Sequence, residues 1–392
     1  MNISFLRAAI VLGLITAVGP FAIDMYLPAL PSISTSLSAS PAAVQMSLMV
    51  FFVIMGACQL VYGPFTDIFG RKLPIYLGLV IFAGGSVGCA FAPNIGTLIA
   101  CRAVQAFGAC AGMVVPRAII RDMHTGPDAT RLMSLLMLVV SISPILAPLT
   151  GSLIIPVAGW RGIFWAITAT SLVALFLAIT QLEETHPSER RSENSWSGSF
   201  SAYRRLLGDL PFMGLTMVGS LTLCGFVIYL ANSSFVLIEH YHLSQTQFSL
   251  CFGINAASFF GFSQLTGRAA EKFGLPKVIR AGVTGFAIFM TTLALLMNYN
   301  TDSLFVMMVL LFMGYGCLGL VLPATAVLSL EEHGAIAGTA SALMGALQLV
   351  IGAVAMAITG LFASSSPKPM VASIAVCAIA AFLIDRFSAR RR

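Results

Sequence analysis

Long apolar runs separated by short polar connections form the dominant pattern of this 392-residue chain. Each run has about 20 residues, enough for a helix to cross the hydrocarbon core of a bilayer. The short alternating segments typical of a membrane barrel do not occur in the sequence. The pattern predicts twelve membrane helices, at residues 6–27, 42–63, 73–92, 95–116, 132–154, 160–182, 210–232, 246–267, 277–297, 302–323, 336–361 and 368–387.

Most connections between these runs are short, so sequential helices are expected to be antiparallel neighbours. The connection at residues 183–209 is longer and mixes charged side chains with Ser, Pro and Gly, as polar linkers do. We therefore predict an N-terminal six-helix bundle at 1–182, a cytoplasmic linker at 183–209 and a C-terminal six-helix bundle at 210–392.

Composition agrees with an all-α integral membrane protein. The chain is 58% hydrophobic and 9% charged, whereas soluble domains are about 25% charged. Its eight cysteines all lie in apolar runs and form no Cys-x-x-Cys pair, so we interpret them as small buried hydrophobic residues. No nucleophile–base set and no metal-binding cluster is visible. The sequence thus predicts a protein that is not an enzyme and that needs no cofactor or metal.

One charged segment occurs twice in the chain. Residues 63–72 combine glycines, Asp67, Arg71 and Lys72 between two apolar runs, and residues 267–274 repeat the spacing Gly-x-x-x-(Asp/Glu)-x-x-Gly. The offset of the two copies is 204 residues, close to half the chain length. We expect each copy to be a tight hairpin where two helices leave the bilayer, and the chain to consist of two similar halves with the same orientation.

The placement of cations tests this topology. With the N-terminus in the cytoplasm, all but three of the 21 Lys and Arg residues fall on the cytoplasmic side. The three exceptions are Arg161, Lys368 and Arg102, and the last of these lies inside a helix. Because cytoplasmic loops are enriched in Lys and Arg, this bias supports an even number of helices with both termini in the cytoplasm.

Two ionisable residues lie inside the predicted helices, Asp24 in the first and Arg102 in the fourth. Such residues are costly in lipid and usually face a cavity or a partner. The functional interpretation is a proton site and its charge partner, since a carboxyl balanced between a low-dielectric cavity and a nearby cation can release a proton when something else binds. The alternative for Asp24 is a position at the membrane surface, where it caps or neighbours a loop. The alternative for Arg102 is a structural ion pair or a bond to backbone carbonyls.

Proline, glycine and amide residues mark further positions. Pro144, Pro148 and Gly151 in the fifth predicted helix are candidate hinge residues, because proline and glycine loosen membrane helices. Amides within apolar runs either bond neighbouring helices or contact substrate. The candidates for a substrate cavity are Tyr26, Gln105, Tyr229, Asn232, Asn255 and Gln348.

These motifs resemble a known family. Residues 63–72 are similar to the loop 2–3 signature of the major facilitator superfamily, residues 98–112 resemble its helix 4 signature, and residues 144–151 resemble its helix 5 antiporter signature. A more specific resemblance, to the Bcr/CflA (bicyclomycin-resistance type) drug:proton antiporters, rests on residues 24–31, 121–122, 143–148 and 338–343. Position 68 departs from the superfamily pattern, because Ile68 stands where a cation is common.

The resemblance implies a fold and an activity. It implies two six-helix bundles around a central cavity and proton-coupled export of small-molecule drugs by alternating access, from a monomer in the bacterial inner membrane. Asp24 and Arg102 would then couple protons, and the gating hairpin would comprise Gly63, Asp67, Gly70, Arg71, Lys72, Arg121 and Asp122. Two alternatives stay open, namely transport of a natural metabolite such as a nucleoside, sugar or amino acid, and a membrane sensor that moves no substrate. No nucleic-acid motif is present.

Overall fold

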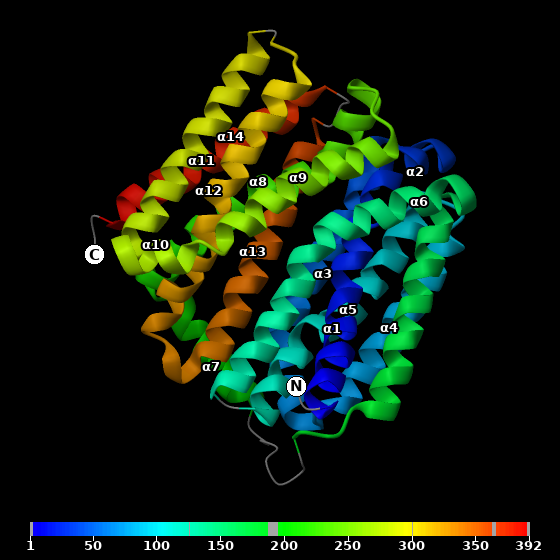
Figure 1. Cartoon of the computed structure of the whole chain (residues 1–392), viewed down its shortest axis with the longest axis vertical. Coiled ribbons are helices and arrows are strands. Elements are labelled where there is room, and N and C mark those ends of the chain that lie inside the picture. Colours follow the sequence, from blue (N-terminus) through cyan, green and yellow to red (C-terminus); the bar gives the residue numbers. More distant parts are fainter. Residues whose placement is uncertain (1–2, 125, 187–194, 300, 363–365, 390–392) are drawn as a thin grey trace. The chain divides into compact units, whose positions relative to one another are not determined.

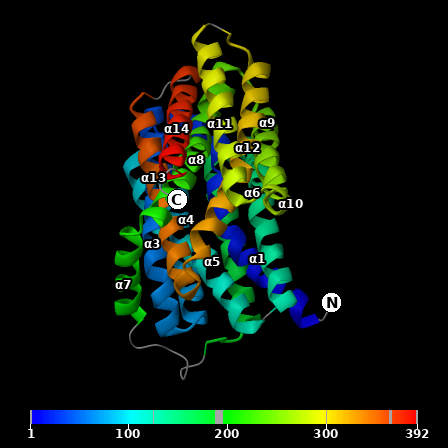
Figure 2. The ribbon, with the colours of Figure 1, turned by 90° about the vertical axis from the view of Figure 1, so that its left-hand side faces the viewer.

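The computed structural model describes residues 3–124, 126–186, 195–299, 301–362 and 366–389, and all regular structure in these residues is helical (Figures 1 and 2). The α-helices are α1 (Ile3–Asp24), α2 (Leu30–Ser36), α3 (Pro41–Phe69), α4 (Lys72–Ala90), α5 (Ile95–Met123), α6 (Gly126–Gln181), α7 (Ser195–Leu207), α8 (Leu210–Ser234), α9 (Gln245–Ser263), α10 (Thr266–Phe273), α11 (Leu275–Asn298), α12 (Leu304–Glu331), α13 (Ala337–Gly360) and α14 (Pro367–Ala389). A short helical turn at Leu27–Ala29 leads into α2, a segment at Phe235–His240 continues α8, and a short helical turn at Gly334–Ile336 leads into α13.

Twelve membrane crossings are present in the part of the chain that the structure describes. Eleven helical stretches are long and apolar enough to span a bilayer, and one of them, Asp128–Gln181, has 54 residues. This stretch contains Gly159, whose φ of 63° and ψ of −176° are not helical. It therefore consists of two successive helices, which confirms the predicted separation of residues 132–154 from 160–182.

The predicted helices all occur, but several boundaries differ. The hairpin prediction for residues 63–72 is too broad, because α3 continues to Phe69 and only Gly70 and Arg71 form the turn. The second copy is likewise mostly helical, since α10 covers Thr266–Phe273. A membrane helix can continue beyond the bilayer into solvent. The apolar run therefore marks the part of the helix that lies in the membrane and not the end of the helix. The polar linker contains a helix, α7, that the sequence analysis did not predict, and residues 187–194 lie outside the described part.

Two compact units divide the chain, and each is a six-helix bundle. The N-terminal unit comprises residues 1–39 and 50–200, and holds α1, most of α3, α4, α5 and both halves of α6. The C-terminal unit comprises residues 40–49 and 201–392, and holds α8, α9, α11, α12, α13 and α14. The first residues of α3 therefore belong to the C-terminal unit, although the rest of that helix does not.

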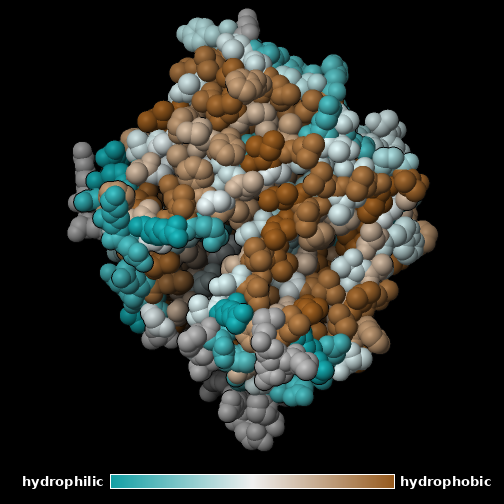
Figure 3. Space-filling view, viewed as in Figure 1, coloured by the Kyte–Doolittle hydropathy of each residue, from teal (hydrophilic) through white to brown (hydrophobic). Residues whose placement is uncertain are grey.

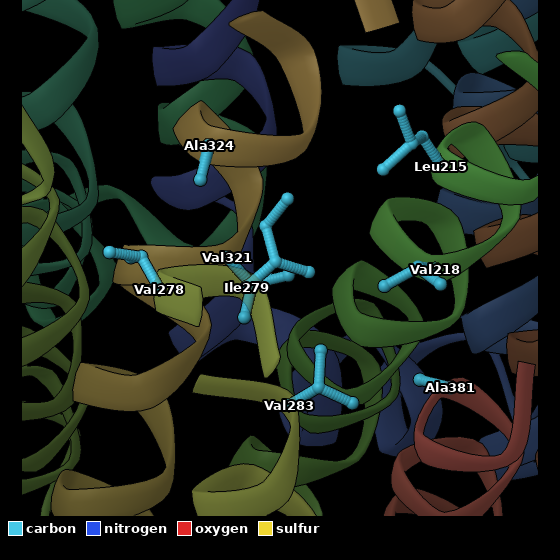
Figure 4. Close-up of a cluster of buried hydrophobic side chains, with 8 residues drawn as sticks. All are labelled: Leu215, Val218, Val278, Ile279, Val283, Val321, Ala324 and Ala381. Atoms are coloured by element: carbon cyan, nitrogen blue, oxygen red, sulfur yellow. The ribbon is translucent and has the colours of Figure 1, made fainter. Parts of the chain in front are cut away.

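Small aliphatic side chains pack the core of the C-terminal unit. Helix α14 runs beside both α8 and α11 (Figures 1 and 2). Figure 4 shows their contact with α12, where buried side chains from all four helices meet. The residues are Leu215, Val218, Val278, Ile279, Val283, Val321, Ala324 and Ala381. Since lipid is as apolar as these side chains, close packing rather than exclusion of water holds the helices together.

Apolar side chains also cover the outer surfaces of the helices. Figure 3 shows broad hydrophobic areas over the helices, while hydrophilic residues gather near helix ends. Large side chains such as Leu153 and Val157 are 67% and 88% exposed. Exposed apolar area of this extent is typical of a surface that faces lipid.

The last glycines of the two copies share one positive φ angle. Gly70 follows α3, Gly274 follows α10, and both have a φ of 83°. This region of backbone space is open to glycine and strained for other residues. The 204-residue offset noted in the sequence therefore relates two glycines with the same positive φ.

Candidate functional site

Asp24 is the last residue of α1 and is buried in the N-terminal unit. Asp24 is 4% exposed, and its Oδ2 accepts a hydrogen bond of 3.3 Å from the hydroxyl of Ser143 on α6. Asp24 borders the turn at Met25 and Tyr26, so the alternative interpretation, a residue that caps or neighbours a loop at the membrane surface, stays open. Asp24 is thus an acidic side chain held inside a bundle by one neutral hydroxyl donor.

Arg102 on α5 is completely buried close to the same end of α1. Its Nη1 donates a hydrogen bond of 3.1 Å to the backbone carbonyl of Ala22 and another to Oε1 of Gln105. The guanidinium carbon lies 4.8 Å from the ring centroid of Tyr26 and 4.3 Å from that of Phe51. Aromatic faces attract a guanidinium electrostatically, so the two rings stabilise a cation that has no carboxylate beside it.

Asp24 and Arg102 form no ion pair with each other. No nitrogen of Arg102 lies within 4.0 Å of a carboxylate oxygen among the described residues. Nε and Nη2 of Arg102 are buried and have no hydrogen-bond partner within the described structure. The contact with Ala22 matches the bond to a backbone carbonyl that we considered for Arg102. The Asp24 carboxylate and the Arg102 guanidinium are therefore not bonded to each other. Nε and Nη2 of Arg102 remain free to donate to another acceptor.

Close helix contacts position these two groups. A Cβ at Gly85 on α4 would lie 2.6 Å from the backbone nitrogen of Gln105, so only glycine lets α4 approach α5 this closely. This approach places the Gln105 amide 2.7 Å from the Ser86 hydroxyl, which orients its carbonyl toward Arg102. On the other side, a Cβ at Gly151 would collide with the backbone carbonyl of Met25.

The predicted hinge residues lie within a continuous helix. Pro144 and Pro148 are inside the first half of α6, and the non-helical backbone of this element occurs at Gly159. Gly151 acts by allowing α6 to touch the chain next to Asp24. The prolines do remove backbone N–H donors from the helix, which weakens it locally. A hinge at these residues stays a prediction.

A second polar network surrounds Arg71 at the α3–α4 turn. Its Nη1 donates to Asp67 Oδ1 at 2.8 Å and to Thr66 Oγ1 at 2.9 Å, and its Nε donates to Asp122 Oδ2 at 2.8 Å. Burial opposes the charged form of Arg71, but the carboxylates of Asp122 and Asp67 outweigh it, so the pKa of the guanidinium is raised. Asp122 is held in turn by the hydroxyl of Thr185 at 3.2 Å.

Glu184, three residues after the end of α6, binds the backbone of the same turn. Its Oε1 accepts from the backbone N–H of Arg71 at 2.9 Å, and its Oε2 accepts from that of Lys72 at 3.2 Å. Arg71 provides no side-chain cap for α4. Glu184 therefore acts as the N-terminal cap of α4 from 112 residues away, where a carboxylate also complements the helix dipole.

Some predicted hairpin residues do not join this network. Arg121 is exposed and makes no hydrogen bond or ion pair with any described residue. The Lys72 ammonium instead lies 5.7 Å from the ring centroid of Tyr76. A Cβ at Gly63 would meet open space, so nothing within its own unit requires glycine there.

The candidate cavity residues of the C-terminal unit form two polar contacts. Asn255 Nδ2 donates to the Tyr229 hydroxyl at 2.9 Å, and Tyr229 stacks on Phe252 with ring centroids 5.6 Å apart. Asn232 Oδ1 accepts from Gln45 Nε2 at 3.0 Å. These contacts fit the interpretation of the amides as bonds between helices. Gln348 is half-buried beside Gly219, and Tyr26 and Gln105 belong to the Asp24–Arg102 region of the N-terminal unit.

Sequence reasoning did not assign several residues that complete these networks. Ser86, Phe51, Glu184 and Thr185 contact the candidate site only because helices distant in sequence pack together. Their residue types are common in polar ends and apolar runs, so no local pattern distinguishes them. The one available signal was the position of Glu184 and Thr185 directly after the last apolar residue of a predicted helix.

Several known proteins are similar to this chain over nearly its full length. A MFS-type transporter of Bacillus subtilis that is described as uncharacterized is 35% identical over 376 residues, covering 95% of this chain and 93% of the relative. A bicyclomycin resistance protein homolog of Haemophilus influenzae is 27% identical and covers 97% and 95%. Multidrug resistance protein D of Escherichia coli is 29% identical and covers 86% and 84%.

The fold is also found among solved structures. The crystal structure of a D-xylose–proton symporter matches with a TM-score of 0.77 at 16% identity, covering 98% of this chain and 97% of the symporter. At this identity the match establishes the shared fold and not a shared substrate. Residues 12–356 match the sequence model of the Major Facilitator Superfamily. With twelve helical crossings in two six-helix bundles and a family match over most of its length, the chain belongs to the Major Facilitator Superfamily.

Proposed function

We propose that this protein is a proton-coupled efflux transporter that exports small-molecule drugs across the bacterial inner membrane by alternating access, as a monomer with both termini in the cytoplasm. The observation that supports this proposal most strongly is the arrangement of two buried ionisable groups in one bundle. Asp24 is held by a single hydroxyl, and Arg102 has two guanidinium nitrogens, Nε and Nη2, without a partner among the described residues. The relatives named for bicyclomycin and multidrug resistance support a drug as the substrate.

The separation of Asp24 from Arg102 suggests how protons and substrate exclude each other. A protonated Asp24 is neutral and can stay beside Ser143, whereas an ionised Asp24 in a bundle needs a stronger partner. Nε and Nη2 of Arg102 are the available donors for it. Substrate that arrives from the cytoplasm would displace the proton, and Arg102 would then stabilise the ionised carboxylate. Arg102 thus tunes the exchange of proton for substrate, and the two bundles rock around this site.

The Arg71 network fits the gating role that the family resemblance implies. Asp67 is the more exposed of the two carboxylates that pair with the Arg71 guanidinium, with 46% of its side-chain surface accessible against 19% for Asp122. It can therefore change partners at low cost while Asp122 retains Arg71. We propose that Asp67 supports closure of the cytoplasmic side. Normal transport kinetics in a correctly inserted Asp67→Ala protein would contradict this role.

Transport by purified protein in liposomes tests the proposal. A pH gradient is imposed, and uptake of amphenicols, bicyclomycin, fosfomycin, sulfonamides, nucleosides and sugars is measured for the wild type, Asp24→Asn and Asp128→Asn. Asp128 is an exposed acidic residue at the start of α6 and serves as the matched control. We expect drug movement that needs the gradient in the wild type and the control, and none in Asp24→Asn. Equal, gradient-independent movement in all three proteins would contradict proton coupling.

Transport of a natural metabolite is the second candidate. The observation that favours it is Asn255, whose Oδ1 is buried without a hydrogen-bond partner beside the Tyr229 hydroxyl. An unsatisfied amide oxygen suits ligands rich in hydroxyl or amino groups, such as nucleosides and sugars. In the same liposome assay, movement of a metabolite and of no drug would select this candidate.

A further inference from the structure

Arg117 is a half-buried cation about two turns before the end of α5. Its Nε is buried and has no hydrogen-bond partner in the described structure. The rest of its guanidinium forms no hydrogen bond or ion pair with any described residue. Burial removes water from this nitrogen, and no acceptor of the described protein replaces that water, so the arrangement costs free energy.

Arg121 and His124 follow Arg117 on the same face of α5. Spacings of four and seven residues place side chains one above another along a helix. The Cβ atoms of Arg117 and Arg121 are therefore about 6 Å apart, and the two guanidinium groups repel each other as like charges. Nε2 of His124 is a second buried nitrogen without a hydrogen-bond partner in the described structure.

The neighbouring helices add a further cation to this end of the N-terminal unit. The Phe5 ring on α1 lies 6.0 Å from the His124 ring, measured between centroids. The guanidinium carbon of Arg131 on α6 lies 5.6 Å from the centroid of the same Phe5 ring. The ends of α1, α5 and α6 thus bring positive charge together around one aromatic side chain.

The acidic side chains near this end do not neutralise these cations. Asp122 binds the guanidinium of Arg71, and its position next to Arg121 turns it about 100° away around the helix axis. Asp128 is exposed and forms no ion pair with any described residue. Arg117 and Arg121 therefore keep their donors available for an acceptor from outside the described protein.

A structural explanation accounts for only one of the two arginines. Cations in the last turn of a helix complement its dipole, and Arg121 has that position. An exposed side chain achieves this without losing water, as Arg121 does. The dipole does not explain why Nε of Arg117 is buried one turn earlier without an acceptor.

We propose that Arg117 and Arg121 bind an oxyanion at the end of α5, with His124 beside it. The ligand is a phosphate, phosphonate or carboxylate group. Guanidinium groups donate to such oxygens in pairs, and these charge-assisted bonds are about twice as strong as neutral ones. Neither arginine belongs to the Asp24–Arg102 site, so the inference goes beyond the proposed transport function.

The oxyanion can come from two sources that present the same oxygens. One source is a small soluble molecule with an anionic group. The other is the headgroup of an anionic phospholipid, because α5 is long and apolar enough to cross a bilayer and Arg117 lies near its end. The chemistry of the site is the same in both cases, and the experiment has one arm for each source.

Titration calorimetry of the full-length protein in a neutral detergent tests the soluble source. The probes are inorganic phosphate, fosfomycin with its phosphonate group, and uncharged bicyclomycin. We expect Arg117→Met to weaken binding of phosphate and fosfomycin about tenfold or more, since bonds to charged groups are strong, and to leave binding of bicyclomycin unchanged. Arg117→Lys should bind with intermediate affinity, because it keeps the charge and lacks the planar fork.

Melting temperatures in lipid nanodiscs test the lipid source. The measured quantity is the difference between nanodiscs of phosphatidylglycerol, which is anionic, and of phosphatidylcholine, which has no net charge. We expect anionic lipid to stabilise the wild type and to lose this effect in Arg117→Met. Arg268→Met is the control in both arms, because Arg268 is an exposed arginine of α10 without an ion pair to any described residue.

The ligand-free protein distinguishes a binding role from a structural one. Arg117→Met removes a buried cationic nitrogen without a partner, so the melting temperature in neutral detergent without added oxyanion should rise. Arg161→Met should lower it, because Arg161 donates to the carbonyl of Ala92 at 2.9 Å and stacks on Trp160. The opposite signs also show that weaker binding by Arg117→Met does not result from unfolding.

Binding that depends on Arg117 in either arm supports the site and identifies the source of the oxyanion. The site is overturned if Arg117→Met changes neither the affinity for phosphate and fosfomycin nor the difference between the two lipids. The same holds if Arg268→Met has an equal effect, because the attraction would then be a general property of basic residues. Neither result bears on proton coupling at Asp24, which the liposome assay measures separately.

Discussion

The hydroxyl of Ser143 on α6 donates a hydrogen bond of 3.3 Å to the carboxylate of Asp24 at the end of α1, across 119 positions of the sequence. It is the hydrogen bond that the Asp24 side chain receives in the described structure. Ser143→Ala should therefore slow proton-coupled export about fivefold, because one hydrogen bond contributes about 1 kcal/mol. Export is measured in liposomes with a fixed pH gradient.

Ser143→Thr is the matched control for this prediction, because it keeps the hydroxyl. We expect it to export faster than Ser143→Ala. An alanine variant as fast as the wild type, beside an inactive Asp24→Asn, would show that Asp24 works without this hydrogen bond.

Lysine should not replace Arg102. A lysine ammonium keeps the charge, but it lacks the planar fork that bonds Ala22 and Gln105 while stacking between Tyr26 and Phe51. We expect Arg102→Lys to reduce the export rate about tenfold or more, since hydrogen bonds to charged groups contribute about 1.5–3 kcal/mol.

Arg161 offers a control of the same kind in the same unit. It also donates to a backbone carbonyl, that of Ala92 at 2.9 Å, and it also stacks on an aromatic ring, that of Trp160 at 4.1 Å. Arg161→Lys should lower the melting temperature without a comparable loss of export. Equal losses of export in both variants would indicate that Arg102 has a structural role alone.

Removal of Glu184 should loosen the α3–α4 turn. Glu184→Ala deletes the acceptor of two backbone N–H groups at the start of α4, and loss of a helix cap costs about 0.5–2 kcal/mol. Faster amide exchange in residues 70–76 is the expected result. Glu183→Ala is the control, because Glu183 is exposed and makes no hydrogen bond with any described residue. The same exchange rate of residues 70–76 in both variants would show that Glu184 does not cap α4.

Stability at the far end of the C-terminal unit should depend on pH through Asp302. The hydroxyl of Tyr241, against a smaller opposing effect of burial and with help from His240 and Lys368, holds the pKa of this carboxyl below its usual value. A carboxyl with a lowered pKa stabilises the folded state at neutral pH. This contribution is lost as the pH falls through the folded-state pKa.

Tyr241→Phe isolates the main contact, because it removes the hydroxyl at 2.6 Å from Asp302 and retains the ring beside His240. The variant should melt at a lower temperature than the wild type at about pH 6, and the difference should shrink toward about pH 3, where aspartate protonates. A difference independent of pH would mean that the hydroxyl acts through something other than the Asp302 charge.

The sequence predicts the membrane helices well because one strong physical requirement, about 20 apolar residues per crossing, determines them. It also locates Asp24 and Arg102, since a charged residue within an apolar run is conspicuous. It does not reveal that Arg102 bonds to Ala22 and not to Asp24. That outcome depends on how α1, α4 and α5 pack, and single-sequence patterns carry no information about such contacts.

The same reasoning explains the other differences. Helix α7 lacks a long apolar run, and the membrane criterion therefore overlooks it. Glu184 lies in a polar connection where many residues of its type occur by chance. Its role follows from backbone N–H groups that tertiary structure brings to it, those of Arg71 and Lys72.

The two turns at Gly70 and Gly274 share a φ of 83°, although their surroundings differ. Arg71 follows the first and binds two carboxylates, whereas Leu275 follows the second. The backbone requirement for glycine is therefore independent of the ion pairs around Arg71. Alanine at Gly70 or Gly274 should distort the chain to a similar degree. A change in proton or salt concentration should affect the turn at Gly70, because the ion pairs of Arg71 lie there.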